Sequence, residues 1–250
     1  MKLNVLLLLF GFSNAFAPAT IPSRKPIMLR ETKEDLKELA KKLNPLIGYY
    51  DPLNLADWNF WGVSEEARIG FLRHSEIKHG RIAMFAFVGY IAHANAVKFP
   101  WSMQLDGTKF PDELNPPLLW DKLSDNAKWQ ILIFIGFLEY WGELSTPNHT
   151  HYMASGGKPG KYPDFVTSST SLPRPIWLNL YDPLRLWKNK SEEEKAKGLL
   201  IEINNGRAAM FGIMGFLSSQ VVPGSIPLLN RVLPGYSGEI MNPFEFHGVH

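Results

Sequence analysis

The sequence predicts an all-α membrane protein with three transmembrane helices, the first and third crossed as a pseudo-two-fold pair, plus short amphipathic surface helices. The main observation is an internal repeat: residues 76–89 read EIKHGRIAMFAFVG and residues 202–215 read EINNGRAAMFGIMG. Eight of the fourteen aligned positions are identical, which indicates a duplication. Each copy runs from polar residues into an apolar segment, and a third apolar segment, WQILIFIGFLEYWGELS, lies between the copies.

The charged residues of the repeat predict how its two helices pair. In each copy a glutamate and an arginine are five residues apart, which places them about 140° apart around a helix, too far to pair well with each other. Neither charge is stable alone in an apolar region. Two crossed copies solve this problem, because Glu76 then meets Arg207 and Glu202 meets Arg81.

Small and polar residues of the repeat support the same arrangement. Gly80 and Gly206 precede the arginines and would let the two backbones approach closely. His79 and Asn205 occupy the same place in the two copies, three residues after the glutamate. Like the glutamates, they offer a lone pair beside the helix, and polar residues at membrane depth are functional by default. The alternative is that His79 and Asn205 only form hydrogen bonds with neighbouring protein groups.

These two segments resemble the first and third membrane helices of the light-harvesting chlorophyll-binding family. The resemblance covers nearly the whole chain after the first 30 residues. It implies that each glutamate, paired with the arginine of the other helix, gives an axial oxygen to a chlorophyll magnesium, and that the histidine and asparagine hold further chlorophylls. Magnesium accepts oxygen ligands readily. The only metal implied is chlorophyll magnesium, bound through Glu76, His79, Glu202 and Asn205.

Composition argues against several other functions. The 250-residue chain has a formal net charge of +2 and no cysteine. A net charge this small gives no indication of a nucleic-acid partner. Without cysteine, the chain can form no disulfide and use no thiolate in catalysis. The family resemblance implies that the protein is not an enzyme.

The first 30 residues resemble a bipartite plastid-targeting presequence. Residues 1–15 have the charged start, short apolar core and small residues of a signal peptide. Residues 16–30 are basic and contain no acidic residue, as in a transit peptide. The junction NAFAP resembles that of algae with red-derived secondary plastids, and an ordinary secreted precursor is the alternative. Residues 31–250 would then form the chlorophyll-binding domain.

The duplication extends into two loops that precede the repeat helices. A charged, solvated amphipathic helix is expected over residues 31–43. GYYDPLNLADW follows it, and NLYDPLRLW precedes the second copy. Proline fixes a turn in each loop, and a turn is all that either loop would indicate alone. The resemblance implies that both loops lie by the ends of two carotenoids, with the candidate residues Asp51, Pro52, Leu53, Asp182, Pro183 and Leu184.

The three spans are expected at about residues 64–97, 125–145 and 192–220. In the first span, His93 lies fourteen residues after His79 and on nearly the same face of the helix. The resemblance to photosystem I-type members of the family makes His93 a candidate chlorophyll ligand. A hydrogen-bonded histidine at the membrane interface is the alternative.

The middle and third spans carry further candidate ligands. The segment KWQILIFIGFLE resembles the chlorophyll a/c branch of the family, which implies chlorophyll contacts for Gln130 and Glu139. For Glu139 the alternative is an exposed helix end. In the third span the usual ligand position of the family falls on Ser219. Either the neighbouring Gln220 replaces it, or that chlorophyll is absent or bound through water.

The connecting segments predict a topology. Residues 146–193 are richer in lysine and arginine than the polar loop 98–124, so the positive-inside bias places them and the N-terminus on the stromal side. One intervening span then makes the two repeat helices run in the same direction. Residues 222–233 are expected to form a short amphipathic segment on the lumenal surface.

The resemblance implies a light-harvesting antenna of the plastid thylakoid membrane that binds chlorophyll a, chlorophyll c, and fucoxanthin or peridinin and related carotenoids. The implied partners are a photosystem core, photosystem I in particular, neighbouring antenna subunits and thylakoid lipids.

Three functions are alternatives to this one: photoprotective quenching by the same fold, a membrane scaffold without pigment, and a di-metal oxidoreductase. Glutamates together with Glu-x-x-His pairs build di-iron sites in helical bundles, and Glu76-x-x-His79 fits that pattern. Its twin ends in Asn205, however, and both arginines would repel the metal ions.

Overall fold

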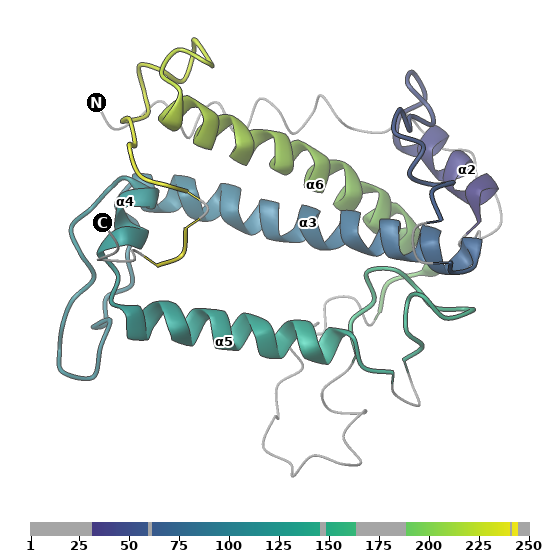
Figure 1. Cartoon of the computed structure of the whole chain (residues 1–250), viewed down its shortest axis with the longest axis horizontal. Coiled ribbons are helices and arrows are strands. Elements are labelled where there is room, and N and C mark those ends of the chain that lie inside the picture. Colours follow the sequence, from purple (N-terminus) through teal and green to yellow (C-terminus); the bar gives the residue numbers. More distant parts are fainter. Residues whose placement is uncertain (1–31, 60–61, 146–148, 164–188, 241, 245–250) are drawn as a thin grey trace. The chain divides into compact units, whose positions relative to one another are not determined.

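The computed structural model describes residues 32–59, 62–145, 149–163, 189–240 and 242–244. These residues contain no β-strand and form five helices, α2 (Lys33–Leu43), α3 (Glu65–Ala94), α4 (Pro116–Lys122), α5 (Asp125–Gly142) and α6 (Glu192–Val221) (Figure 1). The predicted all-α class is therefore confirmed for this part of the chain. The predicted presequence and the second Asp-Pro-Leu loop, Asp182 to Leu184, lie outside the described residues.

The three long helices occupy the ranges in which spans were predicted. Helix α6 ends one residue beyond the predicted range, whereas α3 and α5 end at Ala94 and Gly142, three residues before the predicted ends. Judged by hydropathy alone, no helix in the described ranges is both long enough and apolar enough to cross a membrane. The three membrane crossings therefore stay a prediction.

A reciprocal cap marks the start of α6. The Ser191 hydroxyl accepts a hydrogen bond from the backbone N–H of Glu194 at 3.2 Å, and the Glu194 carboxylate accepts one from the backbone N–H of Ser191 at 2.9 Å. This capping box satisfies backbone donors that have no partner inside the helix. The charged turn before the second repeat is therefore a helix start.

Two expectations for the connecting segments are wrong. Helix α4 lies inside residues 98–124, which were predicted to be a loop; the signal for it is the pair of prolines directly after Asn115, because proline lacks an N–H that the first turn of a helix does not use. Residues 222–233, predicted to form an amphipathic surface segment, form successive turns and no helix. Pro223 and Pro227 lie in that segment and Pro234 directly follows it, and a proline lacks the N–H that continuous helical hydrogen bonding needs.

The chain divides into two compact units. Among the described residues, the first unit comprises those up to Arg81 and from Leu138 to Gly206, and the second comprises Ile82–Phe137 and those from Arg207 onward. Helices α3 and α6 pass through both units, and the two glycines that precede the repeat arginines lie at the end of the first.

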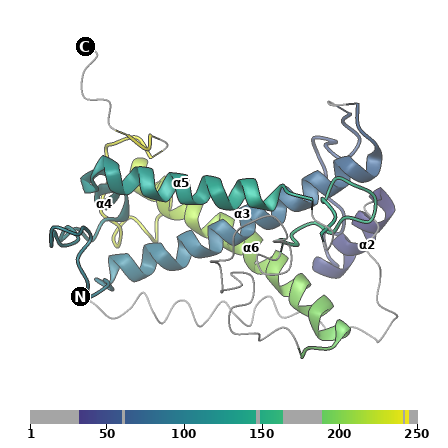
Figure 2. The same ribbon diagram turned by 90° about the horizontal axis from the view of Figure 1, so that it is seen from below.

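Helix α2 packs against the two repeat helices in the first unit (Figure 2). Its buried leucines, Leu39 and Leu43, form one core with Ile77 of α3 and with Leu200 and Ile203 of α6. The amide of Asn204 donates to the carbonyl oxygen of Leu43 at 3.3 Å, which ties the end of α2 to α6. The predicted amphipathic helix is therefore present, but the expectation that it is solvated is wrong, because α2 buries its leucine face.

Contacts along α3 and α6 advance together. Within the second unit, Phe87 of α3 meets Gly212 of α6. Tyr90, one turn further along α3, lies against Phe216, one turn further along α6, with ring centroids 4.8 Å apart. Since residue numbers rise together on both helices, α3 and α6 run in the same direction. This is the direction that one intervening span requires.

Candidate functional site

The site is centred on a backbone contact between the two copies of the repeat. A Cβ atom built on Gly80 would lie 3.0 Å from Cα of Gly206, and one built on Gly206 would lie 2.9 Å from Cα of Gly80. A contact this close leaves no room for a side chain. Because Gly80 and Gly206 are equivalent positions, a two-fold axis relating the copies would pass between them.

One of the two predicted ion pairs lies beside this contact. Arg81 donates from Nε to Oε1 of Glu202 at 2.5 Å and from Nη1 to the carbonyl oxygen of Gly160 at 2.6 Å. The second carboxylate oxygen of Glu202 has no hydrogen-bond partner among the described residues. Glu76 and Arg207 belong to different units, so the other predicted pair stays a prediction.

The two polar residues that follow the glutamates are exposed and present acceptor atoms. His79 Nδ1 lies 2.8 Å from the carbonyl oxygen of Ser75. A carbonyl only accepts, so the proton of the neutral ring is on Nδ1 and Nε2 carries a lone pair. Asn205, at the equivalent place on α6, is also exposed. No group in the described ranges bonds to His79 Nε2 or to the Asn205 amide.

The candidate ligands near the C-terminal ends of α3 and α6 have polar atoms that are buried by other protein groups. His93 Nε2 is buried and, among the described residues, has no hydrogen-bond partner, which is costly for a polar atom and leaves His93 a candidate ligand. Gln220 is 1% exposed and donates from Nε2 to Oδ1 of Asn115 at 2.5 Å and to the carbonyl oxygen of Pro234 at 3.2 Å. Its Oε1 is buried without a partner in this part of the chain, as is the hydroxyl of Ser219. Both alternatives for this position therefore stay open.

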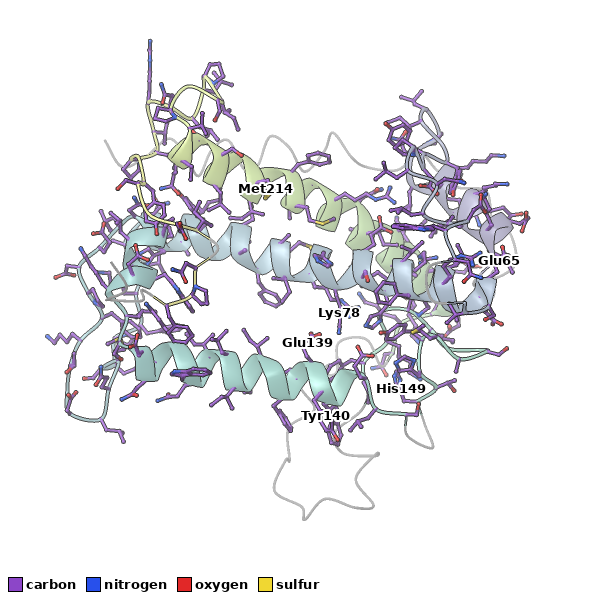
Figure 3. All side chains as sticks on the ribbon, in the orientation of Figure 1. Glu65, Lys78, Glu139, Tyr140, His149 and Met214 are labelled. Carbon is purple, nitrogen blue, oxygen red and sulfur yellow. The ribbon has the colours of Figure 1, made fainter. Side chains whose placement is uncertain are left out.

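The candidates on α5 differ in their partners. Gln130 is exposed, and no described group bonds to its side chain. Glu139 is also exposed, but its Oε2 accepts a hydrogen bond from Nζ of Lys78 at 2.6 Å (Figure 3). The carboxylate is therefore held by a cation from another helix.

Apart from Gln130 and Glu139, most of the exposed surface of helix α5 is apolar. Seven large apolar or aromatic residues of this helix are exposed: Trp129, Ile131, Ile133, Phe134, Ile135, Phe137 and Tyr140. A large apolar helix surface of this kind is normally covered, by a protein core, a partner or a membrane. The described residues of this chain do not provide that cover for α5.

The first Asp-Pro-Leu loop is a turn built by its aspartate. Asp51 accepts hydrogen bonds from the backbone N–H groups of Leu55 at 2.9 Å and Ala56 at 3.0 Å. Burial acts to raise the pKa of Asp51, but these N–H groups, the Tyr49 hydroxyl and the charge of Lys33 together hold the pKa below its usual value. Pro52 and Leu53 are exposed, so the candidate carotenoid contacts of this loop are reachable from outside.

Residues 149–163 contain a contact that the sequence did not reveal. The N–H of Gly160 donates to Nδ1 of His74 at 3.1 Å, while its carbonyl accepts from Arg81. The His74 ring stacks on Tyr152 with centroids 3.8 Å apart. Gly160 has a φ of +76°, and a Cβ there would lie 2.8 Å from Cγ2 of Ile77. The sequence signal for this contact is the glycine that ends GGKPG, residues 156–160, because only glycine suits this backbone conformation and this space.

The geometry offers no support for the di-metal alternative. Among the described residues there is no group of three or more histidine, aspartate or glutamate side chains that could hold a free metal ion. The repeat instead offers single acceptor atoms at the helix surface. One such atom is enough for a metal ion whose other ligands belong to the bound molecule itself.

Comparison with known proteins is consistent with this geometry. Residues 35–221 match the family described as chlorophyll A-B binding protein. A chloroplastic fucoxanthin-chlorophyll a-c binding protein of Trieres chinensis is 30% identical over 240 residues, which cover 93% of this chain and 100% of the relative. Fucoxanthin-chlorophyll a-c binding protein B of Phaeodactylum tricornutum is 32% identical over 231 residues, covering 90% of this chain and 100% of the relative. Protein E of the same name from Macrocystis pyrifera is 31% identical over 187 residues, covering 74% and 75%.

The predicted family resemblance is thus confirmed by matches that span most of the chain, including both copies of the repeat and the helix between them. The chain belongs to the chlorophyll a-b binding protein family of light-harvesting antenna proteins.

Proposed function

We propose that this protein is a light-harvesting antenna subunit of the thylakoid membrane, in which α3, α5 and α6 cross the bilayer and hold chlorophylls and carotenoids. Members of its family are antenna proteins and not enzymes, so the prediction that the chain is not an enzyme is confirmed by its membership.

The observation that carries the proposal is the set of acceptor atoms left over around the helix contact. One carboxylate oxygen of Glu202 accepts a hydrogen bond from Arg81, and one ring nitrogen of His79 bonds to a backbone carbonyl of α3. The second acceptor atom of each has no partner among the described residues, and Asn205 offers an amide oxygen at the place equivalent to His79. Such atoms suit magnesium that already has four ligands from a chlorophyll ring, because a single further ligand is then enough. Magnesium accepts oxygen ligands, and the nitrogen of a neutral imidazole is a common metal ligand.

Chlorophyll, when bound, supplies the absorption of light and the transfer of excitation. The residues of this chain set the spacing, orientation and local polarity of the pigments. The proposed axial ligands are Glu76, His79, Gln130, Glu139, Glu202 and Asn205, with His93 and Gln220 as further candidates, and the proposed carotenoid-end residues are those of the two Asp-Pro-Leu loops.

The pigments are proposed from the relatives, which are named for fucoxanthin and chlorophylls a and c. We assign chlorophyll a, chlorophyll c and fucoxanthin to this chain, with peridinin or a related carotenoid as the alternative to fucoxanthin. Excitation would pass to a photosystem core, photosystem I in particular, and to neighbouring antenna subunits.

The location is proposed on similar grounds. The relatives are named as chloroplastic, and residues 1–30 have the composition of a plastid-targeting presequence. The apolar surface of α5 suits lipid and pigment, and the Arg81–Glu202 pair removes isolated charges from the repeat helices. The N-terminus would face the stroma.

The test is to isolate the protein from its membrane in mild detergent, extract its pigments and separate them by chromatography. Chlorophyll a, chlorophyll c and a carotenoid should co-purify in constant proportion, and excitation in the carotenoid band should produce chlorophyll a fluorescence. A colourless protein would overturn the proposal. A fluorescence lifetime that shortens strongly as the pH falls would instead favour the quenching alternative.

A further inference from the structure

Lys78 of α3 is shared between two carboxylates at the end of α5. Its Nζ lies 2.6 Å from Oε2 of Glu139 and 3.3 Å from Oε1 of Glu143. Figure 3 shows Lys78 and Glu139 directed toward one another from their two helices. The Lys78 side chain is 25% exposed, so this ammonium is partly removed from water and its attraction to the carboxylates is less screened than at an open surface.

Both oxygens of Glu143 are occupied. Its Oε2 accepts hydrogen bonds from Nε2 of His151 and from the hydroxyl of Tyr152, each at 2.9 Å. The other ring nitrogen of His151 accepts from the backbone N–H of Met153 at 3.2 Å, so the proton that reaches Glu143 is on Nε2 even when the ring is neutral. Glu143 is therefore a structural anchor for the loop.

Only one carboxylate oxygen of Glu139 has a hydrogen-bond partner among the described residues. Its Oε2 is held by Lys78, whereas Oε1 has no hydrogen-bond partner among the described residues. No lysine or arginine lies between Glu139 and Ser145, so the final turn of α5 does not supply a cation of its own. The charge of Glu139 is neutralised from α3.

We propose that Lys78 is the positioning residue of the chlorophyll site at Glu139: it neutralises the carboxylate, holds Oε2 and leaves Oε1 as the axial ligand. This inference rests on the proposed function. The position equivalent to Lys78 in the second copy of the repeat is Asn204, so the duplication is asymmetric here. The pigment of the middle helix therefore depends on the first repeat helix and not on the second.

The experiment compares the pigment content of four variants purified with the full complex: Lys78→Met, Lys78→Arg, Glu139→Leu and Lys33→Met. Lys33 is the matched control, because it forms a salt bridge with Asp57 at 2.5 Å in the same unit but touches no candidate ligand. Removing an outer partner of a metal ligand typically weakens metal binding about 10–100-fold. Lys78→Met and Glu139→Leu should therefore each lose roughly one chlorophyll per protein, with the same band missing from the absorption difference spectrum.

Two further comparisons separate positioning from general damage. Lys78→Arg should retain the chlorophyll, because it restores the cation, and the double variant Lys78→Met with Glu139→Leu should lose no more pigment than either single variant. Full pigment in Lys78→Met, with Glu139→Leu lacking one chlorophyll, would overturn the inference and leave the proposed function intact. Full pigment in Glu139→Leu would overturn the ligand role of Glu139 and the inference with it. Only a pigment-free wild-type protein would overturn the proposed function.

Discussion

Arg81 of α3 donates a hydrogen bond from Nε to Oε1 of Glu202 of α6 across 2.5 Å, although the two residues are 121 positions apart in the chain. Spacing inside the repeat excludes a good pair within one helix and requires a partner on the other copy. The structure supplies that partner and adds a second acceptor, the carbonyl oxygen of Gly160. The guanidinium of Arg81 therefore joins two helices and one loop.

Replacing Arg81 should destabilise the first unit. In Arg81→Met both Glu202 and the Gly160 carbonyl lose their donor, and because the pair is about a third exposed we expect a cost of about 1–3 kcal/mol. Arg81→Lys should recover only part of this, since a point charge cannot serve both acceptors in the geometry of a guanidinium. Thermal unfolding of the purified complex measures the effect. A melting temperature for Arg81→Met equal to that of the wild type would contradict the role assigned to the pair.

Adding one methyl group at the helix contact should be far more damaging than adding it elsewhere on the same helix. Gly80→Ala places a Cβ 3.0 Å from Cα of Gly206, so the two backbones must separate. Gly89→Ala is the matched control, because a Cβ there meets nothing within 4 Å. Alanine also favours the helix over glycine by up to about 1 kcal/mol, so the control should be neutral or slightly stabilising.

Chemical denaturation of both variants, followed by circular dichroism, tests this difference. We expect the midpoint of Gly80→Ala to fall and that of Gly89→Ala to stay or rise. Equal behaviour of the two variants would mean that the close contact does not contribute to stability.

Two neighbouring asparagines on α6 should differ in their effect on pigment. Asn205 is exposed and has no partner among the described residues, whereas the amide of Asn204 donates to the carbonyl of Leu43. We expect Asn205→Leu to lose roughly one chlorophyll per protein, since leucine has no atom that can ligate magnesium. Asn204→Leu should keep its pigments and lose some stability. Pigment chromatography together with thermal unfolding distinguishes the two effects, and loss of chlorophyll from Asn204→Leu alone would refute the assignment of Asn205.

The loop of residues 149–163 should loosen in acid because of His149. This side chain is 3% exposed, and burial, together with the nearby charges of Lys161 and His151, lowers its pKa. A histidine in the unfolded loop takes up a proton near pH 6.5, but in the folded loop only at a lower pH. Stability is therefore complete above about pH 6.5 and decreases as the pH falls below that value.

Hydrogen exchange of the loop amides between about pH 8 and pH 5, corrected for the intrinsic rate, measures this dependence. His149→Gln should flatten it, because glutamine does not titrate. An unchanged pH dependence in His149→Gln would assign the effect to another group.

Much of the site was predictable because the chain contains two copies of the repeat, so the role of a residue in one copy predicts the role of the equivalent residue in the other. The Arg81–Glu202 pair, the glycine contact and the exposed positions of His79 and Asn205 all follow from comparing the two copies. Residues without a twin were harder to interpret. Gln220 has an unusual place at the end of its helix, and nothing local indicated that its amide would be held by Asn115 and Pro234.

The sequence by itself determined the helices and the charges that need partners, because hydrophobic spacing, capping residues and the offset between glutamate and arginine are local properties of the chain. Only the tertiary structure decided which groups satisfy those needs beyond the repeat: Gly160 for Arg81, and Lys78 for Glu139. These contacts depend on where an irregular loop and the end of α5 come to lie, and no periodic pattern encodes the path of a loop or the reach of a lysine from one helix to another.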